Sequence, residues 1–267
     1  MAEFRTQIPA HAIERCTASI IFNPSVPDKA FERIVAQSAS QLMSSGFRST
    51  GPSVGLSVDV VTGRVIHSAE GAPKLYIGPD GQTQVTVMPN LIALSTPQYV
   101  RWAHFHNLIE KILRPLCDAY NNIVSINAVK LEYWDRFLWT GSWSDFDVDQ
   151  LLDVSSGVIS QKAMQAEREW HSHCGWFEFL GPSKRLVNVN ADVVEVRENG
   201  VTPLPSIGIY TMMQDQVFTP EHQANFEAVS ASKKFDELHV GLKNLFASLI
   251  LKSYATRIGL LGEKKNA

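Results

Sequence analysis

The sequence predicts an α+β fold with antiparallel sheets and long amphipathic helices, and two similar halves are one option. Three observations support this prediction. Short segments alternate between apolar and polar residues, and Asp80-Gly81 separates two of them as in a tight hairpin turn. Two longer segments, 102–116 and 235–250, carry apolar residues at helical spacing. Hairpins followed by helices are typical of antiparallel sheets.

The first half is predicted to contain a strand, a helix, a hairpin and a second helix. We expect the strand over Ile13–Phe22, the first helix from Asp28 onward, and the hairpin over residues 74–77 and 84–88. The second helix should kink or end at Pro115, because proline has no amide hydrogen to donate inside a helix.

A strand in the middle of the chain departs from its own alternation. Residues 129–139 place apolar side chains at every second position, with charged residues between them, which is typical of a half-buried strand. Trp134 interrupts the polar side of this strand, and Asp135 interrupts the apolar side. A β-bulge or a second covered face would explain both exceptions.

The second half is predicted to follow the same order of elements, although the residues themselves do not repeat. We therefore place a boundary after residue 140, which gives an N-terminal α+β half, 1–140, and a C-terminal α+β half, 141–267. The elements predicted for the second half are a hairpin over Phe177–Leu180 and Leu186–Val196, a turn at Asn199-Gly200, a strand over Ile207–Met213 and a helix from Ser232 onward.

Composition narrows the class of protein. Hydrophobic residues make up 45% of the 267 residues and charged residues 19%, which is typical of a well-packed globular chain. The net charge of −3 argues against a protein that coats nucleic acid or an anionic membrane by bulk charge. Three widely spaced cysteines form no disulfide framework. The start of the chain lacks the apolar core of a signal peptide, so a cytoplasmic location is expected.

Aromatic residues crowd the centre of the chain. Such side chains dominate the energetics of protein cores and interfaces, so this segment must face a core, a partner or a ligand. We interpret it as an interface. The candidate interface residues are five of the six tryptophans: Trp134, Trp139, Trp143, Trp170 and Trp176.

His171 and His173 form the strongest candidate for a metal site. Side chains two apart on a strand point to the same face, so both imidazoles could reach one ion, although a third ligand would be needed. The alternative is that both are surface or structural histidines. If the metal hypothesis holds, the protein would be a metal-dependent hydrolase or nuclease. No motif of a nucleotide-binding loop, a nucleophile elbow or a zinc protease occurs in the sequence.

A nucleic-acid-binding module is a third possibility. Arg101 and Arg114 lie on the predicted helix that also carries Trp102 and Phe105, and arginines with aromatic rings can hold single-stranded nucleic acid by charge and stacking. The balanced net charge makes this hypothesis secondary to protein binding.

The chain also resembles a sporadically distributed prokaryotic protein family with no assigned function. The resemblance spans most of the chain in three blocks: Ala12–Pro24, Tyr99–Trp102 leading into Asn127–Phe137, and Leu238-His239 followed by Leu242, Phe246 and Ile250. It implies no catalytic residues. The patchy occurrence of the family suggests mobile or defence-associated genes.

These observations favour a non-enzymatic, cytoplasmic binding or accessory protein. We expect a regulatory or defence-associated subunit that acts through protein–protein contacts, with a protein partner or with a second copy as a homodimer. No cofactor and no membrane contact are expected.

Overall fold

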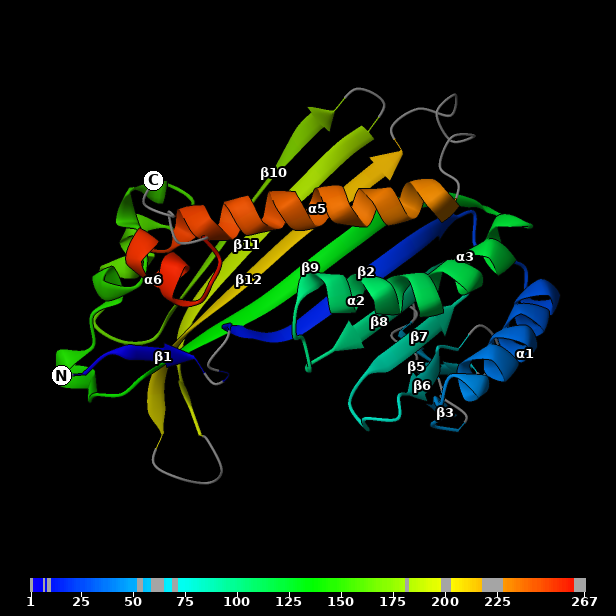
Figure 1. The fold of residues 1–267 in the computed structure, drawn as a ribbon, viewed down its shortest axis with the longest axis horizontal. Coiled ribbons are helices and arrows are strands. Elements are labelled where there is room, and N and C mark those ends of the chain that lie inside the picture. The colour runs from blue at the N-terminus through cyan, green and yellow to red at the C-terminus, as the bar shows by residue number, and fades with distance from the viewer. Residues whose placement is uncertain are drawn as a thin grey trace, which may run out of the picture.

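A ten-stranded antiparallel sheet dominates the computed structural model of this chain (Figure 1). The strands follow the order β10-β11-β12-β9-β2-β8-β7-β6-β3, and β1 pairs with β9 beside this path. β4 and β5 form a separate pair. The structure describes residues 2–6, 8, 11–51, 55–58, 65–68, 72–180, 183–197, 203–217 and 228–261.

The strands are β1 Phe4–Thr6, β2 Ile13–Asn23, β3 Arg48–Ser49, β4 Gly55–Val58, β5 Val65–Ser68, β6 Lys74–Ile77, β7 Gln84–Met88, β8 Leu91–Thr96, β9 Ser125–Trp139, β10 Trp170–Leu180, β11 Ser183–Val196 and β12 Leu204–Val217. The α-helices are α1 Asp28–Ser44, α2 Trp102–Leu108, α3 Arg114–Asn121, α4 Gln161–Met164, α5 Ala228–Leu249 and α6 Lys252–Arg257. A π-helical segment covers Ile109–Leu113, and 3-10 turns cover Trp143–Asp145, Val148–Gln150 and Val154–Ser156.

The predicted fold class is wrong. We expected α+β architecture with long amphipathic helices and two similar halves, whereas most of the described helices are short and the sheet is the main element. The single sheet forms because β9 pairs with β12 on one side and with β2 on the other. Strands from residues 1–140 and from residues 141–267 therefore lie in the same sheet. Hairpin signals report only pairing between neighbours in sequence, so they could not show these two long-range pairings.

Several predicted elements are confirmed. The strand at β2, the helix at α1 and the β6–β7 hairpin form where their patterns indicated. The hairpin of β10 and β11 also forms, but β10 begins at Trp170, seven residues before the predicted Phe177. The turn predicted at Asn199-Gly200 lies outside the described residues.

The helix does not end at Pro115, since the helical stretch 102–121 continues past it to Asn121. This stretch is π-helical over Ile109–Leu113 and returns to α at Arg114, whose amide bonds to the carbonyl of Ile109, five residues earlier. Proline cannot donate within an α-helix, and a π segment accommodates the disturbed ladder by one wider turn. The π-helical segment contacts β8, and α3 contacts β9 and α5.

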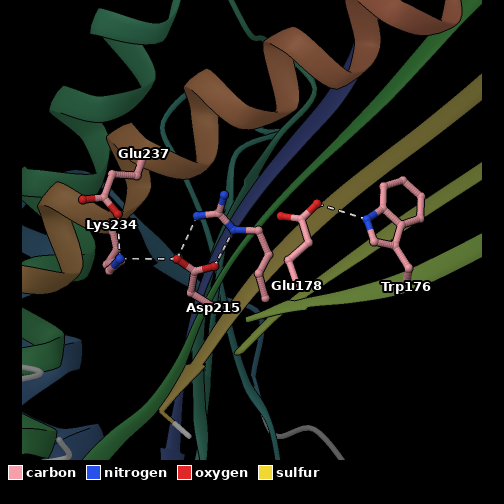
Figure 2. Close-up of polar contacts among 6 residues, drawn as sticks. Trp176, Glu178, Asp215, Lys234 and Glu237 are labelled. Atoms are coloured by element: carbon pink, nitrogen blue, oxygen red, sulfur yellow. Dashed lines mark hydrogen bonds and ion pairs between the residues drawn. The ribbon is translucent and has the colours of Figure 1, made fainter. Parts of the chain in front are cut away.

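The helix α5 crosses the sheet over β12 and β9, on the face that α2 also covers (Figure 1). A buried ion-pair cluster fixes one end of α5 to the sheet, as Figure 2 shows. Asp215 of β12 is fully buried and binds Arg185 of β11 through two hydrogen bonds of 2.6 and 3.0 Å. Lys234 of α5 lies 3.5 Å from the same carboxylate and 2.6 Å from Glu237.

The apolar core beneath the helices has two parts. One gathers around β2, β8 and α1–α3, and the other around β11, the far end of β9 and the end of α5. On β9, Tyr133 belongs to the first part and Phe137 to the second, so Asp135 lies between them. In the described part of the chain, every helix is too short or too polar to cross a membrane.

Candidate functional site

A pocket of about 210 Å³ lies beneath α5, where the two parts of the core meet. We call it the α5 pocket. Its floor is the sheet, its walls are α5, the segment before α2 and the start of β2, and the turn after α6 lies at its margin. It is lined by His11–Ile13, Tyr99–Trp102, Tyr133, Asp135, Thr211, His239, Leu242, Lys243, Phe246 and Ile258–Leu260.

Asp135 is the polar group on the floor of the α5 pocket. It is 5% exposed, and among the described residues no side-chain hydrogen bond or ion pair reaches its carboxyl group. Burial raises the pKa of Asp135 well above its usual value, and the nearby carboxylate of Glu14 raises it further. A buried carboxyl group without a partner is costly, so its presence in a pocket points to a ligand that supplies the partner.

A β-bulge lies directly across from Asp135. The register between β2 and β9 shifts between Ile13, which faces Asp135, and Arg15, which faces Trp134. The extra residue, Glu14, widens the sheet at this point. This bulge belongs to β2, whereas β9 pairs with β12 in unbroken register over residues 128–138, so the bulge predicted within residues 129–139 is not present there. Both faces of β9 carry buried residues, Asp135 on one and Leu138 on the other, which agrees with the alternative of a second covered face.

The two interrupting residues of β9 have different surroundings. Asp135 faces the α5 pocket, while Trp134 lies on the opposite face of the sheet under the guanidinium group of Arg15, 4.0 Å from the ring centroid. The ring of Tyr210 packs against Trp134 at 4.9 Å, and its hydroxyl donates to Glu132 at 2.7 Å. Trp134 is therefore part of a stacked cluster on that face.

His11 is held neutral at the margin of the α5 pocket. The amide of Ile13 donates to Nδ1 at 3.2 Å, so the ring hydrogen lies on Nε2 and donates to the carbonyl of Tyr99 at 2.6 Å. Burial lowers the pKa of His11, and the charge of Arg101 lowers it further. The imidazole thereby ties the start of β2 to the segment before α2.

His239 is the second histidine of the α5 pocket. Its ring stacks on Trp102 at 4.2 Å between centroids, and the hydroxyl of Tyr133 lies 3.0 Å from its Nδ1. Burial lowers the pKa of His239 to about 4, and the charge of Lys243 contributes. Burial also raises the pKa of Tyr133, so this tyrosine keeps its proton beside the neutral imidazole.

Two cations stand at the mouth of the α5 pocket. Arg101 and Lys243 are exposed, and a Cβ atom placed on Gly259 would lie 3.9 Å from the Arg101 guanidinium nitrogen. Neither side chain forms an ion pair within the described residues. The pocket thus has an acidic floor, an apolar middle and a basic mouth.

The five candidate interface tryptophans do not share one environment. Trp139 is 1% exposed and packs on Phe4, and Trp170 is also buried in the core. Trp134, Trp143 and Trp176 are half-buried. Trp170 and Trp176 both lie on β10, the last strand of the sheet.

His171 and His173 lie two residues apart on β10, and both are exposed. They face Asp192 and Asn190 of β11 in the strand register. Within the described ranges, no three histidine, cysteine, aspartate or glutamate side chains gather closely enough to hold a metal ion. The pair is therefore not joined there by the third ligand that the metal hypothesis requires.

The structure does not bring the two nucleic-acid candidates together. Arg101 precedes α2 at the mouth of the α5 pocket, whereas Arg114 begins α3 and pairs with Glu110 at 3.1 Å. Binding of nucleic acid by these residues stays a prediction.

The sequence showed Asp135 as an exception to the apolar alternation of residues 129–139 but did not identify it as a site residue. A carboxyl group at an apolar position of a strand was the signal that could have identified it. His239 and Tyr133 carried no such signal, because their meeting depends on α5 lying over β9. Neither protein-family models nor curated proteins give a match to this chain.

Proposed function

We propose that this protein binds a small organic molecule in the α5 pocket and works as a non-enzymatic accessory or regulatory protein of the cytoplasm. One observation carries the proposal. Asp135 offers a buried carboxyl group, with no side-chain partner among the residues that the structure describes, to a pocket whose other floor and wall residues are largely apolar or aromatic. Ligand sites commonly combine an apolar lining with a few polar groups that orient the ligand.

An ammonium group is the ligand feature that fits Asp135. A primary amine carries three hydrogen-bond donors and a positive charge, and it would replace the solvent that the carboxyl group has lost. Burial and the charge of Glu14 raise the pKa of Asp135 and so favour its neutral acid. Binding of an ammonium ion would favour the carboxylate instead, so binding and ionisation of Asp135 are coupled.

The walls and the mouth of the α5 pocket indicate the chemistry of the rest of the ligand. Tyr99, Leu242 and Phe246 offer apolar and aromatic surface that suits a ring or a short carbon chain. Arg101 and Lys243 at the mouth suit a carboxylate or a phosphate. The ligand class is therefore a small zwitterion, with an amine at one end, an apolar body and an anion at the other end.

The histidines of the α5 pocket support binding rather than proton transfer. Both ring nitrogens of His11 are used in contacts to the backbone, and His239 is stacked on Trp102 and bonded to Tyr133. These contacts hold the pocket walls in place. A rigid pocket lowers the entropy cost of binding, because its side chains are already ordered.

Calorimetry with three related probes tests this proposal. 4-(2-Aminoethyl)benzoate has the amine, the ring and the anion; 4-ethylbenzoate lacks the amine, and phenethylamine lacks the anion. We expect the first probe to bind at least about tenfold more tightly than 4-ethylbenzoate, since a charge-assisted hydrogen bond contributes about 1.5–3 kcal/mol. Asp135→Asn should abolish this preference, whereas Asp118→Asn, at an exposed carboxylate of α3, should keep it.

The pH dependence gives a second readout. The ammonium probe needs ionised Asp135, so its affinity should rise by up to about tenfold per pH unit below the raised pKa of this residue. In Asp135→Asn the affinity should not change over the same range. No binding of any probe at millimolar concentration, or an amine preference that survives Asp135→Asn, would contradict the proposal.

A further inference from the structure

Thr211 of β12 is a second buried polar residue on the floor of the α5 pocket. Its side chain lines the pocket and is 1% exposed. Among the residues that the structure describes, no side-chain hydrogen bond reaches its hydroxyl group. A buried hydroxyl group that has lost water without gaining a partner costs free energy. Valine has nearly the same shape without this cost, so packing alone does not explain a threonine here.

Two other buried threonines show how the fold satisfies such hydroxyl groups. Thr83 and Thr96 are 6% and 2% exposed, and their hydroxyl groups bond to each other at 2.9 Å. Thr83 also donates to Asp80 at 2.5 Å, and Thr96 accepts from the amide of Gln98 at 3.1 Å. Thr211 lacks such partners within the described part of the chain, which points to a partner from outside it.

The strand register places Thr211 beside Asp135. Thr211 faces Tyr133 across the pairing of β12 with β9, and Ile209 faces Asp135. Thr211 and Asp135 are therefore diagonal neighbours on one face of the sheet, about 7–8 Å apart. Both line the α5 pocket, so one small molecule can reach both polar groups.

A ligand hydroxyl group on the carbon next to the amine-bearing carbon suits this pair. The Asp135 carboxylate only accepts hydrogen bonds, whereas the Thr211 hydroxyl group both donates and accepts. A ligand hydroxyl group can accept from Thr211 and donate to Asp135, while the neighbouring ammonium group also donates to Asp135. A carbonyl group has no hydrogen to donate to Asp135, and a second ammonium group would repel the first.

We propose that the α5 pocket selects a β-hydroxy amine of one handedness and that Thr211 recognises its hydroxyl group. The assignment rests on the proposed binding of an ammonium group by Asp135. Arg101 and Lys243 at the mouth hold the anion, so the amine, the hydroxyl group and the anion each have a separate partner. Three separate contacts distinguish a chiral carbon from its mirror image, because the mirror image satisfies only two of them at once.

Unfolding without ligand tests whether the hydroxyl group of Thr211 has a structural role. Thr211→Val removes the hydroxyl group and nearly keeps the shape, so the midpoint of urea unfolding should stay the same or rise. Thr96→Val makes the same change at a buried hydroxyl group that has partners, so its midpoint should fall. An equal fall in both variants would overturn the proposal, because Thr211 would then serve the fold itself.

Calorimetry with a matched pair of probes tests the selectivity. 4-(2-Amino-1-hydroxyethyl)benzoate differs from 4-(2-aminoethyl)benzoate only by the hydroxyl group, and its two enantiomers would be titrated separately. One enantiomer should bind at least about fivefold more tightly than the other and than the probe without the hydroxyl group. Thr211→Val should remove this gain and leave the affinity for 4-(2-aminoethyl)benzoate unchanged. Thr86→Val, on β7 outside the pocket, should keep the gain.

The outcomes distinguish the role of Thr211 from that of Asp135. If 4-(2-aminoethyl)benzoate does not bind, the proposed function and the role of Thr211 are both overturned. If this probe binds through Asp135 but neither enantiomer of the hydroxylated probe gains affinity, only the role of Thr211 is overturned. The same conclusion holds if Thr211→Val weakens the binding of all three compounds equally. Circular dichroism would verify that each variant folds.

Discussion

At the scale of single residues, Asp135 and His239 show how one neighbourhood shifts two groups toward their neutral forms. Burial raises the pKa of Asp135 and lowers the pKa of His239, because a charge of either sign is less stable away from water. Both residues line the α5 pocket, yet no hydrogen bond or ion pair between them is present. An incoming cation would restore the charge of Asp135 without needing the imidazole.

His239 should make the folded state weaker in mild acid. The unfolded chain takes up a proton on this residue near pH 6.5, whereas the folded chain does so only near pH 4. As the pH falls between these values, the unfolded state binds more protons, so the free energy of unfolding decreases. The free energy of unfolding should decrease by on the order of 2 kcal/mol. This is less than the full pKa shift of His239 implies, because part of the ring reaches solvent.

Urea denaturation at several pH values from 4.5 to 7.5 would measure this effect. In His239→Gln the dependence on pH should be clearly smaller than in the wild type, because the titrating ring is absent. His171→Gln, on the exposed side of β10, serves as the matched control and should follow the wild-type curve. Equal pH dependence in wild type and His239→Gln would show that the ring is not desolvated.

At the scale of elements, α5 is held in place by a buried charge cluster as well as by apolar packing. Arg185 and Lys234 come from β11 and α5, and both reach the carboxylate of Asp215 on β12 (Figure 2). Because Asp215 is fully buried and accepts both hydrogen bonds from Arg185, the cluster depends mainly on this carboxylate. Because α5 forms one wall of the α5 pocket, the cluster also fixes the position of that wall.

Removing the central carboxylate should be costly. In Asp215→Asn, the largely buried Arg185 loses its countercharge, and we expect the free energy of unfolding to fall by about 3 kcal/mol. Glu237→Gln alters a more exposed member of the same cluster and should cost less than about 1 kcal/mol. Urea unfolding followed by tryptophan fluorescence would compare them, and equal losses for both variants would contradict this role of Asp215.

At the scale of the whole molecule, β9 makes one sheet out of both halves of the chain. It pairs with β12 over residues 128–138 and with β2 on its other side. Removing either neighbour would expose a long apolar edge in the middle of the core. The helices α3 and α5 also depend on β9, since α5 contacts β9 and β12 while α3 contacts β9 and α5.

Unfolding should therefore be one cooperative transition. Far-ultraviolet circular dichroism follows the sheet, and tryptophan fluorescence follows residues on both sides of the predicted boundary after residue 140, so the two signals should give the same midpoint in urea. Two separate transitions would mean that residues 1–140 and 141–267 unfold independently, despite the shared sheet. Trp102→Phe would serve as a control, because it removes one of the three tryptophans of residues 1–140 and should leave the midpoint unchanged.

The local properties of the chain could be predicted from its residue pattern. Alternation in residues 129–139 predicted β9 and its buried side, helical spacing predicted α1, and Pro115 predicted a disturbed helix. It also exposed Asp135 as a polar residue at an apolar position. Each of these properties depends on side chains within one turn or one strand of each other, so periodicity is enough to show them.

The strands that became neighbours and the residues that lie beneath α5 could not be predicted in this way, because they depend on the folded chain. Tyr133 and His239 are 106 residues apart, and Tyr99 and His11 are 88 residues apart, yet these contacts shape the α5 pocket. The same holds for the place of β10 at one end of the strand order, because that order depends on pairings between distant parts of the chain. Such features arise from long-range packing of the whole chain, which the pattern of a single segment does not encode.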